Sequence, residues 1–210
     1  MWTVPDTAHR YDPNMTDDAR PIEVVPATLD RWDDIMLVLD GDGEVVCWCQ
    51  PWRGDVAKGE SRPDALRRQL AEGTPPPGFL AYLDGEPVGW VGVSARSIAP
   101  RLRNSRTIPA IDDRDVWAIG CFRIRIGFRR RGVATALLDG VLAAAREAGA
   151  PGVEAYPIDP AGKRVDVGFG FVGIASMFDR AGFRRVLETG GHSAGLPRLL
   201  VRLDLEPART

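Results

Sequence analysis

The feature that most constrains this sequence is a β-rich run that passes through a basic turn directly into a long helical pattern. The run Val116–Ile126 is rich in β-branched and aromatic residues, which favours a strand. Three consecutive arginines follow, and Gly132–Ala148 then places its apolar residues on one helical face. Unpaired N–H groups and the positive end of the helix dipole would converge at such a junction. The turn therefore predicts a site for a phosphate-bearing ligand.

The rest of the chain alternates between short β-rich runs and helical patterns. Asp84-Gly85 between the two β-rich runs Phe79–Leu83 and Val88–Val93 favours a tight hairpin. The segment Cys47–Gly54, with its Pro and Gly, is expected to be an ordered loop, and Ser97–Arg114 an irregular one. The other elements expected are strands at 20–25, 153–158, 183–187 and 199–205 and helices at 29–39, 63–73 and 173–181. This order predicts an α/β fold with a single mixed, mostly antiparallel central sheet flanked by helices.

Composition and charge limit which domain organisation and which partners are compatible with the sequence. The first 19 residues are polar and aperiodic, so we expect a flexible N-terminal lead-in at 1–19 and a single domain at 20–210. A net charge of −2 gives no overall basic field for nucleic acid or an anionic membrane. No apolar run approaches the length of a spanning helix, no leader is evident, and three cysteines are too few for a disulfide framework. These features predict a cytoplasmic protein, and exposed strand edges leave a homodimer open.

Two motifs carry a resemblance to a known family. Arg129, Gly132 and Ala134 have the spacing of a cofactor motif in which Gln or Arg is followed three residues later by Gly and then by Gly or Ala. The stretch Phe178–Phe183, Phe-Asp-Arg-Ala-Gly-Phe, is similar to the Tyr-Glu-Lys-Leu-Gly-Phe found near the C-terminal end of that family. On these residues the sequence resembles the GNAT superfamily of N-acetyltransferases over roughly residues 20–205.

The resemblance implies that acetyl-CoA is the co-substrate and that a primary amine of a small molecule or protein attacks it directly in a ternary complex. Backbone amides between Arg130 and Thr135 would bind the pyrophosphate, and the strand after the cofactor helix would splay from the preceding one to admit the pantetheine arm. A strand N–H near Phe122 would stabilise the oxyanion. The cofactor-binding residues predicted in this way are Phe122, Ile124, Arg129, Arg130, Arg131, Gly132, Val133, Ala134, Thr135 and Phe178.

The residues at the positions where the family places its acid and base differ from the family pattern. Phe178 stands where the family often has a tyrosine acid, and Ala118 where other members have a glutamate. Glu154 and Tyr156 share one face of the next strand by alternation, and they are the candidate catalytic residues. Solvent or simple positioning remains open beside them. Trp48 and Trp52 are the candidate acceptor-binding residues, because their loop follows the first helix, where this family commonly builds that site.

Three other interpretations of these and neighbouring residues are weighed against an acetyltransferase. Phe178 and Ala118 also fit an acyl-CoA-binding regulatory module with little catalysis. The arginine cluster would fit a nucleic-acid patch, which the helix that follows disfavours. Cys47 and Cys49 with only two histidines in the chain disfavour a zinc site, so no metal is expected.

Overall fold

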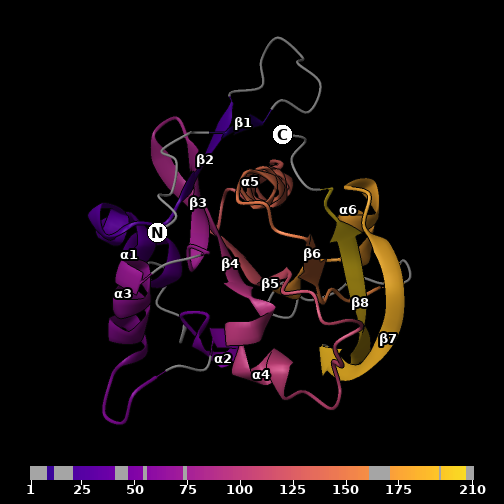
Figure 1. Cartoon of the computed structure of the whole chain (residues 1–210). Helices are drawn as coiled ribbons and strands as arrows, with labels where there is room; N and C mark the ends of the chain where they lie inside the picture. The colour runs from indigo at the N-terminus through magenta and orange to yellow at the C-terminus, as the bar shows by residue number, and fades with distance from the viewer. Residues whose placement is uncertain are drawn as a thin grey trace.

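The computed structural model describes residues 9–11, 21–40, 47–53, 56–72, 75–160, 171–193 and 195–206. Eight strands of this part of the chain form one sheet in the order β1-β2-β3-β4-β5-β6-β8-β7. All neighbouring strands are antiparallel except β5 and β6, which run parallel. The strands are β1 His9–Tyr11, β2 Ile22–Pro26, β3 Gly78–Leu83, β4 Glu86–Ala95, β5 Trp117–Ile124, β6 Gly152–Ala155, β7 Arg184–Ser193 and β8 Leu196–Asp204. The prediction of a mixed, mostly antiparallel sheet is confirmed (Figure 1).

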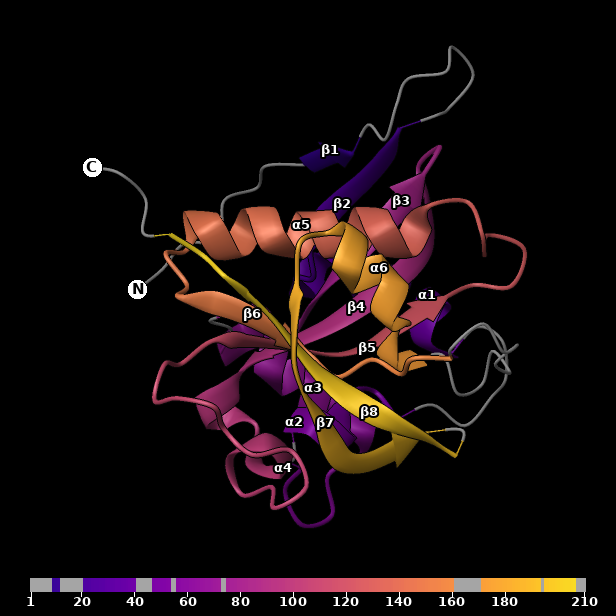
Figure 2. The same ribbon diagram turned by 90° about the vertical axis from the view of Figure 1, so that its right-hand side faces the viewer.

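Helices cover both faces of this sheet (Figures 1 and 2). The α-helices are α1 Trp32–Asp40, α2 Gln50–Arg53, α3 Arg62–Glu72, α4 Pro100–Arg103, α5 Val133–Glu147 and α6 Ala175–Arg180, with 3-10 turns η1 Leu29–Arg31 and η2 Arg96–Ile98. In Figure 2, α5 lies along one face, and α2, α3 and α4 lie on the other. A helix on each face lets alternate residues of a strand be buried on opposite sides.

Two core clusters follow from this layering. The first joins α5 and α6 to the sheet through residues such as Val91, Leu137 and Phe178. The second joins α1 and α3 to the opposite face through Ile35, Leu66 and the wholly buried Trp90. The hairpin at Asp84-Gly85 forms as predicted, with both residues at positive φ.

Several local predictions are corrected by the structure. His9–Tyr11 pairs with β2, so this part of the predicted lead-in belongs to the sheet, while residues 1–8 and 12–19 lie outside the described part. The expected loop after Cys47 contains α2, and the loop after Ser97 contains α4. Strand β6 ends at Ala155, three residues before the predicted end, because the chain there leaves its partner β5. Single turns of helix lack the sequence length needed for a periodic signal, which is why they were missed.

Among the helices that the structure describes, none is long and apolar enough to cross a membrane. The same residues include no group of three or more His, Cys, Asp or Glu side chains arranged to hold a metal ion.

Candidate functional site

The centre of the candidate site is an opening between the two parallel strands. β5 and β6 pair only at Trp117 with Val153, Ala118 with Glu154 and Ile119 with Ala155. Beyond these pairs β5 continues to Ile124 with no strand partner on that side among the residues that the structure describes. The chain after β6 turns toward β8 through an Ile158 to Arg198 bridge. The unpaired stretch leaves strand N–H and C=O groups at the middle of the sheet, where a ligand can use them.

A β-bulge lies where this opening begins. Gly92 pairs with Cys121 but its neighbour Val93 pairs with Ile119, so Gly120 is an extra residue in β5. The bulge changes which residues of β5 face each side of the sheet. Ile119 and Phe122, three residues apart, therefore both face the α5 core. A Cβ on Gly120 would lie 2.8 Å from Cγ of Trp52, so only glycine lets this ring cover the bulge.

The N-terminus of α5 supplies free hydrogen-bond donors at the end of the sheet where β5 finishes. The first hydrogen bond of the helix runs from the Ala136 N–H to the Gly132 carbonyl at 2.9 Å. The N–H groups of Val133, Ala134 and Thr135 therefore have no acceptor within the helix. Together with the helix dipole, they favour an anion at this position.

The turn before α5 has the backbone shape of an anion-binding loop. The backbone φ is negative at Arg129, 62° at Arg130, negative again at Arg131 and 82° at Gly132, so its sign alternates along the turn. Alternation of this kind turns successive N–H groups toward one concave side. All four residues are exposed. The predicted cofactor residues of the turn and the helix start are thus brought together.

The arginines near this turn divide into two sets. Arg123 donates to the Val38 carbonyl at 3.0 Å on the α1 side, and Arg125 is paired with Glu86 at 2.8 Å. Both are committed to the protein. Arg129, which bonds the Ile124 carbonyl at 3.3 Å, remains exposed beside Arg130 and Arg131, so the cationic surface is confined to the turn.

Aromatic residues line the α5 side of the opening. Phe122 of β5 and Phe178 of α6 meet edge to face with ring centroids 6.2 Å apart, and Phe183 contacts Phe178 from the other side at 5.2 Å. Ile124 packs against the same cluster. The predicted Phe122, Ile124 and Phe178 therefore share one apolar wall, although Phe178 is wholly buried.

Glu154 and Tyr156 lie on the opposite face, in a buried ionic network. Arg96 donates to Glu154 Oε2 at 2.9 Å and to the Tyr156 hydroxyl at 2.7 Å, and that hydroxyl donates to Glu154 at 3.0 Å. Arg202 reaches the other carboxylate oxygen of Glu154 at 3.2 Å. Glu154 and Tyr156 are each 1% exposed. Burial and the Glu154 carboxylate raise the pKa of Tyr156 well above its usual range despite Arg96.

The two tryptophans predicted to bind the acceptor have different settings. Trp48 is 5% exposed and stacks on Trp32 at 6.0 Å, so its ring is part of the α1 core and the acceptor prediction is not supported for it. Trp52 is half-buried and lies parallel to Tyr156 at 5.6 Å. Arg53, the next residue of α2, fixes this helix to β4 through the Val93 carbonyl at 2.8 Å. Of the two tryptophans, Trp52 is the one that lies against Gly120 at the bulge.

The three cysteines form a cluster of free thiols behind α2. Cys49 Sγ lies 2.8 Å from Cys121 Sγ and accepts a hydrogen bond from the Trp90 indole at 3.2 Å. Hydrogen bonds with Cys47 and Cys49, and burial, raise the pKa of Cys121 well above its usual range. A buried, protonated thiol is a poor nucleophile, so Cys121 is better suited to packing than to covalent catalysis.

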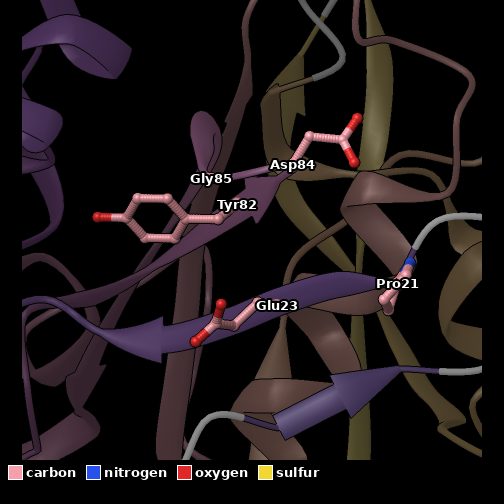
Figure 3. Close-up of a pocket in the computed structure, with 5 residues that line it drawn as sticks. All are labelled: Pro21, Glu23, Tyr82, Asp84 and Gly85. Carbon is pink, nitrogen blue, oxygen red and sulfur yellow. The ribbon is translucent and has the colours of Figure 1, made fainter.

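A separate pocket lies over β2 and β3 near the turn into β4, on the side of the sheet occupied by α1 (Figure 3). Its lining includes the carboxylates of Glu23 and Asp84, and the Tyr82 hydroxyl donates to Asp34. Figure 3 shows the Glu23 and Asp84 side chains directed away from each other. Negative charge makes this pocket unsuitable for a diphosphate, so it is distinct from the turn before α5.

Sequence motifs indicate the turn before α5 but not the residues on the opposite face of the sheet. An isolated glycine within a strand signals a bulge, so Gly120 could have been found. Arg96 and Arg198 carry no comparable signal, because their roles depend on contacts with segments distant in sequence.

The comparisons with known proteins agree with this geometry. The sequence model of the acetyltransferase (GNAT) family matches residues 43–161. Among solved structures, a GNAT-family acetyltransferase from Bacillus cereus aligns with a TM-score of 0.53 and 16% identity over 88% of this chain and 98% of its own. A ribosomal-protein-alanine N-acetyltransferase from Brucella melitensis gives 0.53 and 18% over 87% and 99%.

The NatC complex bound to Gag peptide and CoA aligns with a TM-score of 0.54 and 13% identity over 88% of this chain and 99% of its own. No curated protein sequence matches the chain. Identities this low show a shared fold, whereas the family model covers more than half of the chain. The opening between β5 and β6, the anion-binding turn and this match lead to one conclusion: the chain belongs to the GNAT family of acetyltransferases.

Proposed function

We propose that the protein transfers the acetyl group of acetyl-CoA to a primary amine by direct attack in a ternary complex. The observation that carries the proposal is the unpaired part of β5 after Ile119, which leads from the bulge to the N-terminus of α5. The family match supports acetyl transfer in general, and the CoA in the NatC neighbour supports the choice of donor.

Each part of the cofactor has a matching surface along this path. The free N–H groups of Val133, Ala134 and Thr135, with the exposed arginines 129–131, suit the pyrophosphate. The aromatic wall of Phe122 and Phe178 suits the pantetheine arm. Backbone N–H groups released from the ladder at the bulge beside Phe122 are the proposed donors to the thioester oxygen as it gains negative charge.

The amine would approach from the α2 face, past Trp52. The cofactor turn begins α5 on the opposite face, so the two substrates meet at the opening without competing for one surface. Transfer forms a bond between the amine nitrogen and the acetyl carbon and breaks the carbon–sulfur bond. One proton leaves the nitrogen and one is gained by the thiolate.

Calorimetry with acetyl-CoA and thiol release with a panel of amines test the proposal. Micromolar to millimolar binding and amine-dependent release of CoA are expected. Binding without release would favour the alternative of an acyl-CoA-binding module, for which Phe178 in place of an acid is the relevant observation. If the protein does not bind acetyl-CoA at millimolar concentration, both the acetyltransferase and the acyl-CoA-binding module are contradicted.

A catalytic role for Glu154 and Tyr156 stays a prediction, and their contacts support a positioning role better. The Tyr156 hydroxyl already donates to Glu154 and accepts from Arg96, so it has no free proton aimed at the opening. We expect Tyr156→Phe to lose far less than the ~100-fold that loss of a general acid typically costs.

The measurement is the pH profile of thiol release for the wild type and Tyr156→Phe, with melting temperatures recorded beside it. A moderate loss of stability with an unchanged profile is the expected result, because one buried hydrogen-bonded hydroxyl is removed. A loss of 100-fold or more at unchanged stability, with the basic limb of the profile gone, would restore Tyr156 as the acid.

A further inference from the structure

Arg198 of β8 has an unusual setting on the α2 side of the opening. Its guanidinium carbon lies 5.3 Å from the centre of the Trp52 ring and 5.8 Å from that of Phe171. Stacking on aromatic faces leaves the N–H groups at the edge of a guanidinium available to a third group.

Arg198 has no carboxylate partner among the residues that the structure describes. Other arginines of the C-terminal hairpin do: Arg185 pairs with Asp179 and Asp159, and Arg202 pairs with Glu154. Nε of Arg198 is buried without a hydrogen bond, and burial lowers the pKa of the side chain. A partly buried guanidinium with no carboxylate partner in the described part of the chain is suited to an anionic ligand.

The position of Arg198 connects it to the reacting centre. Its backbone bridges to Ile158, and the next residue donates to the Pro157 carbonyl at 2.8 Å, so β8 continues the sheet where β6 has left β5. Trp52 contacts Arg198 through its ring and also covers Gly120. The same indole ring therefore contacts both the guanidinium and the bulge.

We propose that Arg198 binds a carboxylate of the acceptor, so that the acceptor is a small amine that also carries a carboxylate. This inference rests on the proposed function and names its substrate class. The planar edge of a guanidinium matches the two oxygens of a carboxylate in a bidentate pair, and the ligand would supply the negative charge that the described residues do not.

The spacing also bears on the length of this acceptor. Arg198 and the bulge both contact Trp52, so a carboxylate at the first and an amine nitrogen at the second would be about the size of an indole apart. An ω-amino acid with several methylene groups spans this gap better than glycine, whose amine and carboxylate share one carbon.

The test compares acids with their neutral amides. The probes are 4-aminobutyrate and 6-aminohexanoate with the matching ω-amino amides, titrated by calorimetry into the protein with and without CoA. We expect wild type to bind an acid about 10- to 100-fold more tightly than its amide, the range for hydrogen bonds to a charged group. Arg198→Gln should bring the ratio near one and leave amide affinity unchanged.

Arg185→Gln is the matched control, because Arg185 lies on the adjacent strand but is neutralised by two carboxylates. It should keep the preference of wild type for the acid. Equal binding of acid and amide by wild type, or no binding of either acid, overturns the carboxylate proposal. Such a result leaves the proposed function standing if acetyl-CoA still binds. Conversely, failure of acetyl-CoA to bind overturns the function, while the titrations without CoA still decide the role of Arg198.

Discussion

Replacing Gly132 with aspartate is expected to lower the affinity for acetyl-CoA by ~100-fold or more, since like charges in contact cost several kcal/mol. The new carboxylate would stand at the start of α5, where the free N–H groups of Val133 to Thr135 converge. It would accept those hydrogen bonds itself and repel the diphosphate. Calorimetry with acetyl-CoA measures the loss.

The variant should nevertheless fold. A Cβ at Gly132 meets nothing closer than Ile22 Cδ1 at 3.9 Å, and aspartate is a preferred N-cap that favours the positive end of the helix dipole. These gains offset the cost of about 1 kcal/mol for a side chain at a φ of 82°. The melting temperature should therefore change little while binding is lost.

Gly149→Asp provides a matched control at the other end of α5. Gly149 also has positive φ, 67°, and a Cβ there has no neighbour within 4 Å. The same strain and charge are thus introduced about 25 Å away along the helix. Acetyl-CoA should bind this variant as it binds wild type. Equal affinities of Gly132→Asp and Gly149→Asp would show that the diphosphate does not bind at the start of α5.

Glu154→Gln is expected to destabilise the protein by about 3–5 kcal/mol, the cost of breaking a buried ion pair. The carboxylate of Glu154 is 1% exposed and neutralises both Arg96 and Arg202. An amide of the same shape leaves Arg96 with the Tyr156 hydroxyl and the Ile108 and Leu102 carbonyls but no opposite charge. Urea denaturation measures the change in the free energy of unfolding.

Asp204→Asn makes the same chemical change at an exposed partner of the same network. The Asp204 side chain is 40% exposed while it pairs with Arg202, so its loss should cost at most about 1 kcal/mol. A Glu154→Gln variant as stable as Asp204→Asn would contradict the structural role of the buried network. The double variant Arg96→Met, Glu154→Leu should recover part of the lost stability, because Arg96 is then no longer buried without a counter-charge while Arg202 keeps its pairs with Asp112 and Asp204.

Local sequence pattern was sufficient to predict the junction of strand, turn and helix before α5 and the hairpin at Asp84-Gly85. Each of these signals lies within a few residues, where backbone preference and helical periodicity act directly. The short helix α2 and strand β1 were missed, because segments of three or four residues form only through contacts with the rest of the molecule. Trp48 lies in the loop after the first helix, which indicated an acceptor-binding residue. Its ring is instead stacked on Trp32 in the core, a contact that local sequence pattern does not reveal.

The sequence by itself determined the class of the fold and the turn from Arg129 to Thr135 that leads into α5, the turn for which cofactor binding is proposed. Only the tertiary structure decided what lies across the sheet from that turn. Arg96 and Glu154 are 58 residues apart, and Trp52 reaches Gly120 and Arg198 from yet another segment. Such contacts depend on strand register and on the layering of helices, because a side chain gains a partner across the sheet only when both backbones are already in place.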